Sequence, residues 1–184
     1  WPEAPIQMGI IKNPIVKKIL FWLEKIIYKN ATKIVTLSPG MTKGVERFGF
    51  DKDITMISNI SDCEYYQNEA KITKNTFYYG VGDRLVVSYI GAIGKVNNID
   101  YIVSVAKECQ NQNLKQIVFL IAGRGSELKR LRTKTQELGL KNIRFLGFQN
   151  RNELKKLMNV TDVSIITFAD KPILETNSPN KFFD

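Results

Sequence analysis

The polar residues near the end of the chain have the types and spacing of a site for a sugar carrying a diphosphate. Glu175 is followed by three residues whose side chains hydrogen-bond readily to sugar hydroxyls, namely Thr176, Asn177 and Ser178. Ser178 and the proline after it form a typical helix start, which would direct backbone N–H groups and Lys181 toward a diphosphate. On spacing alone, a capped surface helix explains the same residues equally well.

Glycine turns follow three of the expected strands, and glycine lets a backbone approach a phosphate closely. The residues of interest in and beside these turns are Gly91, Gly94 and Lys95, then Gly123, Arg124 and Gly125, and finally Phe148. Lys95 and Arg124 add positive charge. Any one of these turns is best explained as an ordinary strand-to-helix connection. Their recurrence at successive strand ends favours a nucleotide-type ligand.

The order of elements in the second half predicts a doubly wound parallel sheet. Strands are expected at 85–90, 117–121, 142–146 and 163–167, and helices between them at 100–110, 126–138 and 152–159. Alternating strands and helices give a parallel sheet covered on both faces, as in Rossmann-like domains. The first part also alternates, with helices expected at 14–28 and after Ser38 and strands at 32–37 and 54–57.

We therefore predict an α/β chain with two Rossmann-like domains. Residues 1–59 are assigned to the end of an N-terminal domain, 60–84 to a linker, and 85–184 to most of a C-terminal domain. The chain starts at Trp1 and stops at Asp184 without a polar tail, and is interpreted as a fragment.

The composition excludes some functions and leaves others open. The chain of 184 residues is 43% hydrophobic and has no histidine, so it supplies no histidine base and no histidine metal ligand. Its two cysteines form no C-x-x-C pattern and fit a reducing compartment. The net charge of +9 indicates nucleic acid, acidic lipid or a phosphorylated ligand as partner, or simply a solvated basic surface.

The helix expected from residue 14 to 29 combines aromatic and basic side chains. Its apolar face, which includes Ile15, Ile19 and Leu23, is expected to pack on the protein core, with Glu24 on the polar face. Five other residues are interpreted as facing an anionic membrane surface: Lys17, Lys18, Phe21, Lys25 and Tyr28. The alternative is that both rings pack on a neighbouring element. No stretch is apolar for the roughly 20 residues that span a bilayer.

Several motifs resemble those of one enzyme family. Residues 178–184 read S-P-N-K-F-F-D, similar to the donor-binding motif S-P-N-K-[FL]-F-[DE] of the retaining family 4 glycosyltransferases, which have the GT-B fold. Residues 118–125 and 143–162 resemble two further segments of that family. Trp1-Pro2-Glu3 is similar to a run in polysaccharide and O-antigen transferases, including the fucosamine-transferase type.

The resemblance implies roles for the matching residues. Asp184 would bind the nucleotide ribose, Lys181 the diphosphate, and Glu175 with Thr176 to Ser178 the donor sugar. Glu175, Lys181 and Asp184 are thus the implied catalytic group. The glycine turns would approach the phosphates, and the backbone at Phe148 would meet the base. Two departures stand out. The Glu175–Asp184 spacing is one residue longer than E-x7-E, and Ala92 replaces the usual arginine, so Lys95 would act with Lys181.

The implied function is sugar transfer from a nucleotide-sugar donor to a lipid-linked or polysaccharide acceptor, with retention, in cell-surface polysaccharide synthesis. The resemblance also implies no metal, no cofactor and no nucleic-acid partner, with the enzyme cytoplasmic and peripheral on the inner face of the plasma membrane. Acceptor-site residues would lie in a part of the protein outside this sequence, so the fragment alone is expected to be inactive. The alternatives are another GT-B enzyme, such as a nucleotide-sugar 2-epimerase, or a non-enzymatic basic module that binds membrane or nucleic acid.

Overall fold

The computed structural model describes residues 2–50, 53–62, 64–65, 79–176 and 178. The chain divides into two compact units. One contains Trp1–Ser61 together with Asp170–Asp184, and the other contains Asp62–Ala169. The segment from Asp170 groups with the first unit, whereas the sequence-based division assigned it to the C-terminal domain. The reason is that a 3-10 helix, η2 (Pro172–Thr176), contacts helices of the first unit.

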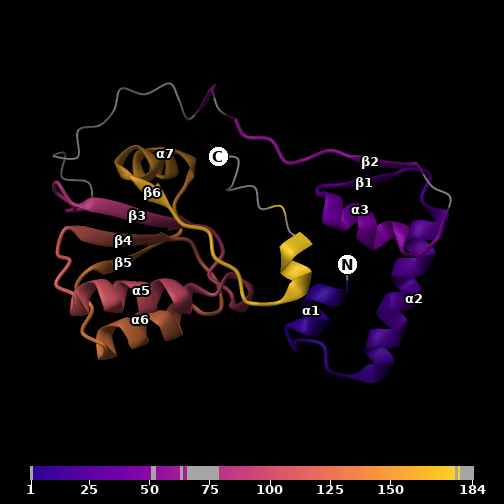
Figure 1. Ribbon diagram of the computed structural model, residues 1–184, viewed down its shortest axis with the longest axis horizontal. Helices are drawn as coiled ribbons and strands as arrows, with labels where there is room; N and C mark the ends of the chain where they lie inside the picture. The colour runs from indigo at the N-terminus through magenta and orange to yellow at the C-terminus, as the bar shows by residue number, and fades with distance from the viewer. Residues whose placement is uncertain (1, 51–52, 63, 66–78, 177, 179–184) are drawn as a thin grey trace. The chain divides into compact units, whose positions relative to one another are not determined.

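The second unit is built on a four-stranded parallel sheet. Its strands are β3 (Leu85–Ile90), β4 (Ile117–Ala122), β5 (Ile143–Gly147) and β6 (Val163–Ser164), in the order β5-β4-β3-β6. Helices α5 (Ile99–Asn111) and α6 (Leu128–Glu137) lie on one face and α7 (Arg151–Val160) on the other (Figure 1). A short 3-10 helix, η1 (Lys95–Asn97), precedes α5.

Alternation along β4 explains how both faces of this sheet are filled. Phe119 and Ile121 point into a core shared with α5 and α6. Val118 and Leu120 point the other way, into a core shared with α7. A strand buried on both faces must be apolar throughout, which is why β4 reads as a continuous hydrophobic run. The predicted parallel α/β sheet is confirmed, although α6 begins two residues later than expected and β6 is shorter.

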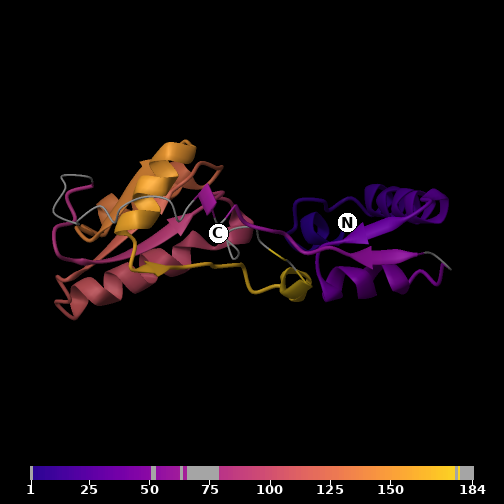
Figure 2. The ribbon, with the colours of Figure 1, turned by 90° about the horizontal axis from the view of Figure 1, so that it is seen from above.

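The first unit contains a two-stranded parallel pair, β1 (Ile34–Thr36) and β2 (Ile54–Met56). Its helices are α1 (Glu3–Gln7), α2 (Pro14–Asn30) and α3 (Pro39–Glu46). Figure 2 shows α2 on one side of the two strands and α3 on the other. Both longer helices start with a side-chain cap followed by proline. Asn13 accepts from the N–H groups of residues 15 and 16, and Ser38 from that of Met41.

The apolar face of α2 is not covered by the described residues as predicted. Its apolar side chains are mostly exposed, with Ile15 at 66%, Trp22 at 60% and Ile27 at 59%. Glu24, which the sequence places on the polar face, is the buried residue of the helix at 3%. The expectation that the apolar face packs on the core is therefore wrong for the residues that the structure describes. The contacts of α2 run instead through Glu24, which lies 3.8 Å from Arg47 Nη2 and accepts from Tyr28.

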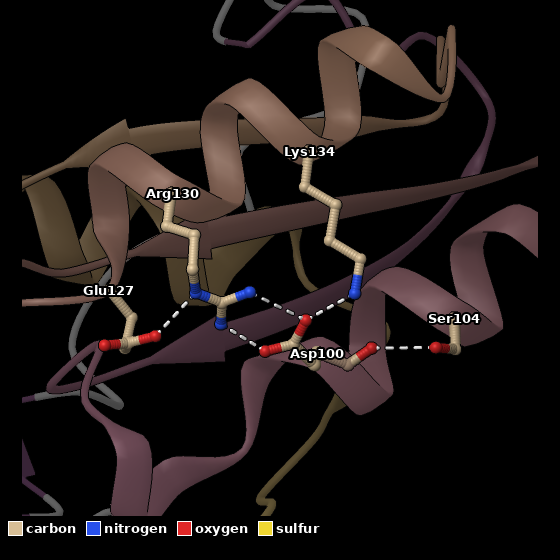
Figure 3. A network of polar contacts seen from close by, with 5 residues as sticks. All are labelled: Asp100, Ser104, Glu127, Arg130 and Lys134. Carbon is tan, nitrogen blue, oxygen red and sulfur yellow. Dashed lines mark hydrogen bonds and ion pairs between the residues drawn. The ribbon is translucent and has the colours of Figure 1, made fainter.

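An ion-pair network joins α5 to α6 (Figure 3). The Asp100 carboxylate, in the first turn of α5, accepts from Arg130 and from Lys134 Nζ, the latter at 2.5 Å. Glu127 binds the other side of Arg130 at 2.7 Å. Hydrogen bonding from Arg130 lowers the pKa of Asp100 to about 2. Because the folded-state pKa lies below the ordinary value of 3.8, the network stabilises the fold above that pH. This contribution disappears as pH falls through about 2.

Candidate functional site

The connectivity of the second unit places one end of the sheet at a topological switch point. From β3 the chain moves outward through β4 to β5 and then returns to β6 on the other side of β3. Doubly wound sheets bind ligands at the carboxyl ends of the two strands that flank such a point. The residues after β6 are tied to those after β3, since Ala169 N donates to Val96 O at 2.8 Å and Thr167 Oγ1 to Asn97 O at 2.5 Å.

The predicted glycine turns meet at this end of the sheet and are joined through their backbones. Gly91 N donates to Ala122 O at 2.9 Å, and Gly123 N donates to Gly147 O at 2.7 Å. Ile93 N donates to the Arg124 carbonyl at 2.9 Å. The turns after β3, β4 and β5 therefore form one continuous structure, which we call the glycine rim (residues 91–95, 123–125 and 147–148).

Two glycines of the rim have no space for a side chain. Gly123 has a φ of +144°, and a Cβ there would overlap the Gly91 carbonyl, lying 2.9 Å from its carbon. A Cβ on Gly125 would lie 2.5 Å from the Ile93 carbonyl carbon. Both obstacles are backbone atoms, which cannot rotate away. The glycines therefore allow neighbouring turns to touch, which is a packing requirement in addition to any approach of a phosphate.

Tyr89 supports the rim and was missed by the sequence analysis. Its ring is fully buried, its hydroxyl donates to Ala92 O at 2.7 Å, and burial raises its pKa. The Tyr89 side chain, which belongs to β3, thus fixes the turn that follows this strand. A tyrosine in an otherwise apolar buried strand is a signal that could have been used, because a buried hydroxyl needs a partner.

The helix after the first glycine turn starts within one residue of the expected position. Residues 95–97 form η1, and α5 begins at Ile99. Ahead of α6, Glu127 N donates to Ile93 O at 3.1 Å and Leu128 N to Gly125 O at 3.3 Å. These two amides are therefore already hydrogen-bonded within the rim and do not face a ligand. Lys95 lies exposed in η1.

The structure brings together two predicted residues from different turns. The Arg124 guanidinium lies over the Phe148 ring, 4.9 Å from its centroid, and the ring is 63% exposed. A cation over an aromatic face is an attractive arrangement. An exposed ring beside a guanidinium can stack on a nucleobase while the cation pairs with a phosphate. The glycine rim therefore presents an exposed aromatic ring and a cation, two groups that suit a nucleotide.

The first unit has a separate cavity of about 450 Å³ at the carboxyl ends of β1 and β2. Three of its lining residues are predicted donor-sugar contacts, namely Glu175, Thr176 and Ser178. The others come from the ends of the two strands and from α3: Leu37, Ser38, Pro39, Gly40, Met56 and Ser58. Hydroxyls and a carboxylate suit sugar hydroxyls. The predicted residues Asn177, Lys181 and Asp184, and the predicted helix after Ser178, lie outside the described residues.

The five residues interpreted as membrane-facing differ in their surroundings. Lys18, Phe21 and Lys25 are exposed, and Lys17 is half-buried. Tyr28 packs edge-on against Phe48 with ring centroids 5.4 Å apart, and burial together with the neighbouring Glu24 carboxylate raises its pKa to about 12. Among the described residues, no helix has the length and apolar character needed to cross a bilayer.

The sheet topology and the glycine rim define a Rossmann-like α/β protein of the GT-B type. The crystal structure of Anabaena HepE in complex with UDP and glucose superimposes with a TM-score of 0.65 at 21% identity, over 79% of this chain and 41% of HepE. The predicted fold class is confirmed. The family model of glycosyl transferases group 1 matches residues 72–172, more than half of the 184 residues. The chain belongs to this family.

Two curated relatives act in surface polysaccharide synthesis according to their names. One is the lipopolysaccharide core biosynthesis glycosyltransferase LpsD of Rhizobium meliloti, 26% identical over 147 residues, which cover 79% of this chain and 40% of LpsD. The other is the putative colanic acid biosynthesis glycosyl transferase WcaI of Escherichia coli, 22% identical over 171 residues, or 89% of this chain and 41% of WcaI. The chain thus spans about 40% of the length of these relatives.

Proposed function

We propose that the protein is a retaining glycosyltransferase of family 4, close to the polysaccharide and O-antigen transferases of the fucosamine-transferase type. It moves a sugar from a nucleotide-sugar donor to a lipid-linked or polysaccharide acceptor in cell-surface polysaccharide synthesis. The observation that carries the proposal is the glycine rim at the switch point, with Arg124 stacked on the exposed Phe148 ring. Membership of the group 1 family and the names of LpsD and WcaI support it.

In this proposal each unit has its own task in donor binding. The glycine rim takes the nucleotide, with Phe148 against the base and Arg124 and Lys95 near the phosphates. Glu175, Thr176 and Ser178, which line the cavity of the first unit, hold the sugar. As the bond between the sugar and the diphosphate breaks, negative charge gathers on the leaving diphosphate. Lysine and arginine side chains stabilise that charge more in the transition state than in the ground state, in place of a metal ion.

The nucleotide half of the proposal is tested by substitution in the glycine rim. In the full-length enzyme, Phe148→Ala and Arg124→Ala are each expected to weaken UDP binding by about tenfold, because stacking and a charge-assisted contact are worth roughly 1–3 kcal/mol each. Isothermal titration calorimetry with UDP, GDP and dTDP gives the affinities. Arg132→Ala, an exposed arginine of α6 outside the rim, is the matched control and should bind like wild type. Wild-type protein that binds none of the three nucleotides would contradict the proposal.

We also propose that the enzyme is cytoplasmic and attaches to an anionic membrane through the exposed part of α2. Lys18, Phe21 and Lys25 are exposed there with Lys17 beside them, and each lysine near an acidic surface is worth about 1 kcal/mol. Full-length protein should co-sediment with anionic vesicles at low salt and be released at high salt. Changing Lys17, Lys18 and Lys25 to Gln and Phe21 to Ser should reduce this binding clearly.

The matched control for the membrane experiment removes the same number of charges elsewhere. Lys107, Lys115 and Lys129 are exposed on the second unit, and their triple change to Gln should leave vesicle binding unaltered. If both variants lose vesicle binding equally, the net charge of the protein, and not α2, causes the attraction to anionic vesicles. If wild type shows no preference for anionic vesicles, the membrane proposal fails.

A further inference from the structure

We propose that Ser38, Gly40 and Asn59 are positioning residues for the donor sugar. They hold the backbone of the segment that carries Thr176 and Ser178, and so fix the groups that line the sugar cavity. The inference rests on the proposed function, because it assigns these residues a task in donor binding. The contacts themselves are features of the first unit and are independent of it.

Ser38 makes the first of these contacts with one hydroxyl used twice. Its Oγ caps α3 by accepting from Met41 N at 3.2 Å, and donates to the Thr176 carbonyl at 2.6 Å. The residue is held in turn by its neighbours, since Thr42 Oγ1 donates to Ser38 O at 3.2 Å and lies 2.6 Å from Thr36 Oγ1. Ser38 is buried, so its proton has little choice of acceptor other than this carbonyl.

Gly40 makes the second contact by lacking a side chain. A Cβ at this position would lie 2.7 Å from Thr176 Cβ and 3.0 Å from Thr176 Cα. The backbone of the first turn of α3 therefore packs directly against the Thr176 side chain of η2, at a distance that only glycine permits. By comparison, a Cβ on Gly44, one turn further along α3, would meet nothing within 4 Å. The tight fit is thus confined to the end of α3 that faces Thr176.

Asn59 makes the third contact, from the residues that follow β2. Its Nδ2 donates to the Ser178 carbonyl at 2.7 Å. Thr176 is also tied within η2, because its Oγ1 donates to Ile173 O at 2.8 Å. The carbonyls of Thr176 and Ser178 are thus both fixed by side chains of the first unit, while Glu175 stays exposed and lines the cavity. Ser38 and Asn59 bind backbone carbonyls of this segment, which leaves the Glu175 side chain available for a ligand.

This division of contacts predicts a selective defect. Loosening the segment should weaken binding of the sugar part of the donor and leave binding of the nucleotide part almost unchanged. In the full-length enzyme, Ser38→Ala and Asn59→Ala are expected to weaken UDP-glucose binding about fivefold to tenfold, the value of one hydrogen bond. UDP binding should stay within about twofold of wild type. Ser38→Thr keeps the hydroxyl and should restore most of the affinity, and Ser104→Ala, an exposed serine of α5, serves as control.

A measurement without ligand separates this inference from the proposed function. Hydrogen–deuterium exchange of the peptide covering 171–178 should be faster in Ser38→Ala, Asn59→Ala and Gly40→Ala than in wild type or in Gly44→Ala. Unchanged exchange would overturn the inference, as would equal losses of UDP and UDP-glucose affinity. Faster exchange in a protein whose wild type binds no nucleotide would instead overturn the proposed function and leave the contacts standing.

Discussion

Replacing Gly123 with alanine is expected to destabilise the protein by about 2–5 kcal/mol and to abolish nucleotide binding. Two effects combine. A residue with a Cβ at φ +144° is strained by roughly 1–2 kcal/mol, and overlap with the Gly91 backbone adds about 1–3 kcal/mol. Relief of the overlap would push the turn after β3 away from the turn after β4, which opens the glycine rim. Urea unfolding and calorimetry with UDP measure the two consequences.

Gly139→Ala is the matched control for Gly123→Ala. Gly139 also has a positive φ, of +62°, but a Cβ there would meet nothing within 4 Å. This variant therefore carries backbone strain without overlap and should lose only about 1 kcal/mol, with unchanged nucleotide affinity. Equal losses of stability in the two variants would mean that backbone strain dominates and that contact between the turns is unimportant. Normal UDP binding by Gly123→Ala would mean that the glycine rim is not the nucleotide site.

Lys181→Ala is expected to cause a large loss of catalytic efficiency. Lys181 lies outside the residues that the structure describes. The sequence predicts a helix that starts at Ser178, with Lys181 one turn in, and we expect its ammonium to meet the donor diphosphate. Losing a charge-assisted contact to the leaving group should raise the barrier by roughly 2–4 kcal/mol, which lowers kcat/KM by about 30-fold to 1000-fold. Steady-state kinetics of the full-length enzyme provide the test. Lys171→Ala, at an exposed lysine ahead of η2, should keep normal kcat/KM.

If Lys181→Ala and Lys171→Ala have the same kcat/KM as wild type, Lys181 has no role at the diphosphate. Lys95 and Arg124 would then be the remaining candidates for the cation of that site. A double variant, Lys95→Ala with Lys181→Ala, distinguishes shared from separate roles. Losses that add in free energy indicate separate contacts, whereas a smaller combined loss indicates that the two lysines act on the same charge.

The parallel sheet could be predicted from the sequence because its signal is local. Each strand is a short apolar run and ends in a polar or glycine turn, as at Gly91 and Gly123, and helices of ordinary length lie between them. The elements themselves were therefore recognisable. The strand order β5-β4-β3-β6 has no such local signal, since it depends on which strands pair and not on any one segment. That order is what identifies the switch point.

Helix α2 shows where periodicity stops being informative. The pattern correctly groups Ile15, Ile19 and Leu23 on one side of a helix, but it does not say what lies opposite that side. The structure buries Glu24 instead, because Arg47 and Tyr28 are placed to meet its carboxylate. Arg47 is more than twenty positions away in the sequence, so no helical pattern could have revealed the pairing. The burial of a charged residue is decided by such partners.

The contacts of the sugar cavity were equally inaccessible to sequence reasoning. From the sequence, Ser38 was expected only to precede a helix, and the structure shows that it caps α3 by accepting from Met41 N. Its second partner, Thr176, lies 138 positions further along the chain. Residues that position a site from such a distance carry no local motif. The residues predicted from motifs were those expected to touch the donor, whereas the residues that hold them come from elsewhere in the chain.

The joined turns of the glycine rim have a thermodynamic consequence for any ligand that binds there. Because Gly91, Gly123 and Ile93 are hydrogen-bonded into one backbone structure, the conformational entropy of the turns is lost when the chain folds and not when a nucleotide arrives. Association then requires no loop closure and proceeds at the rate of an ordinary docking encounter. If a nucleotide binds there as proposed, we expect differences in affinity among nucleotides to appear mainly as differences in residence time.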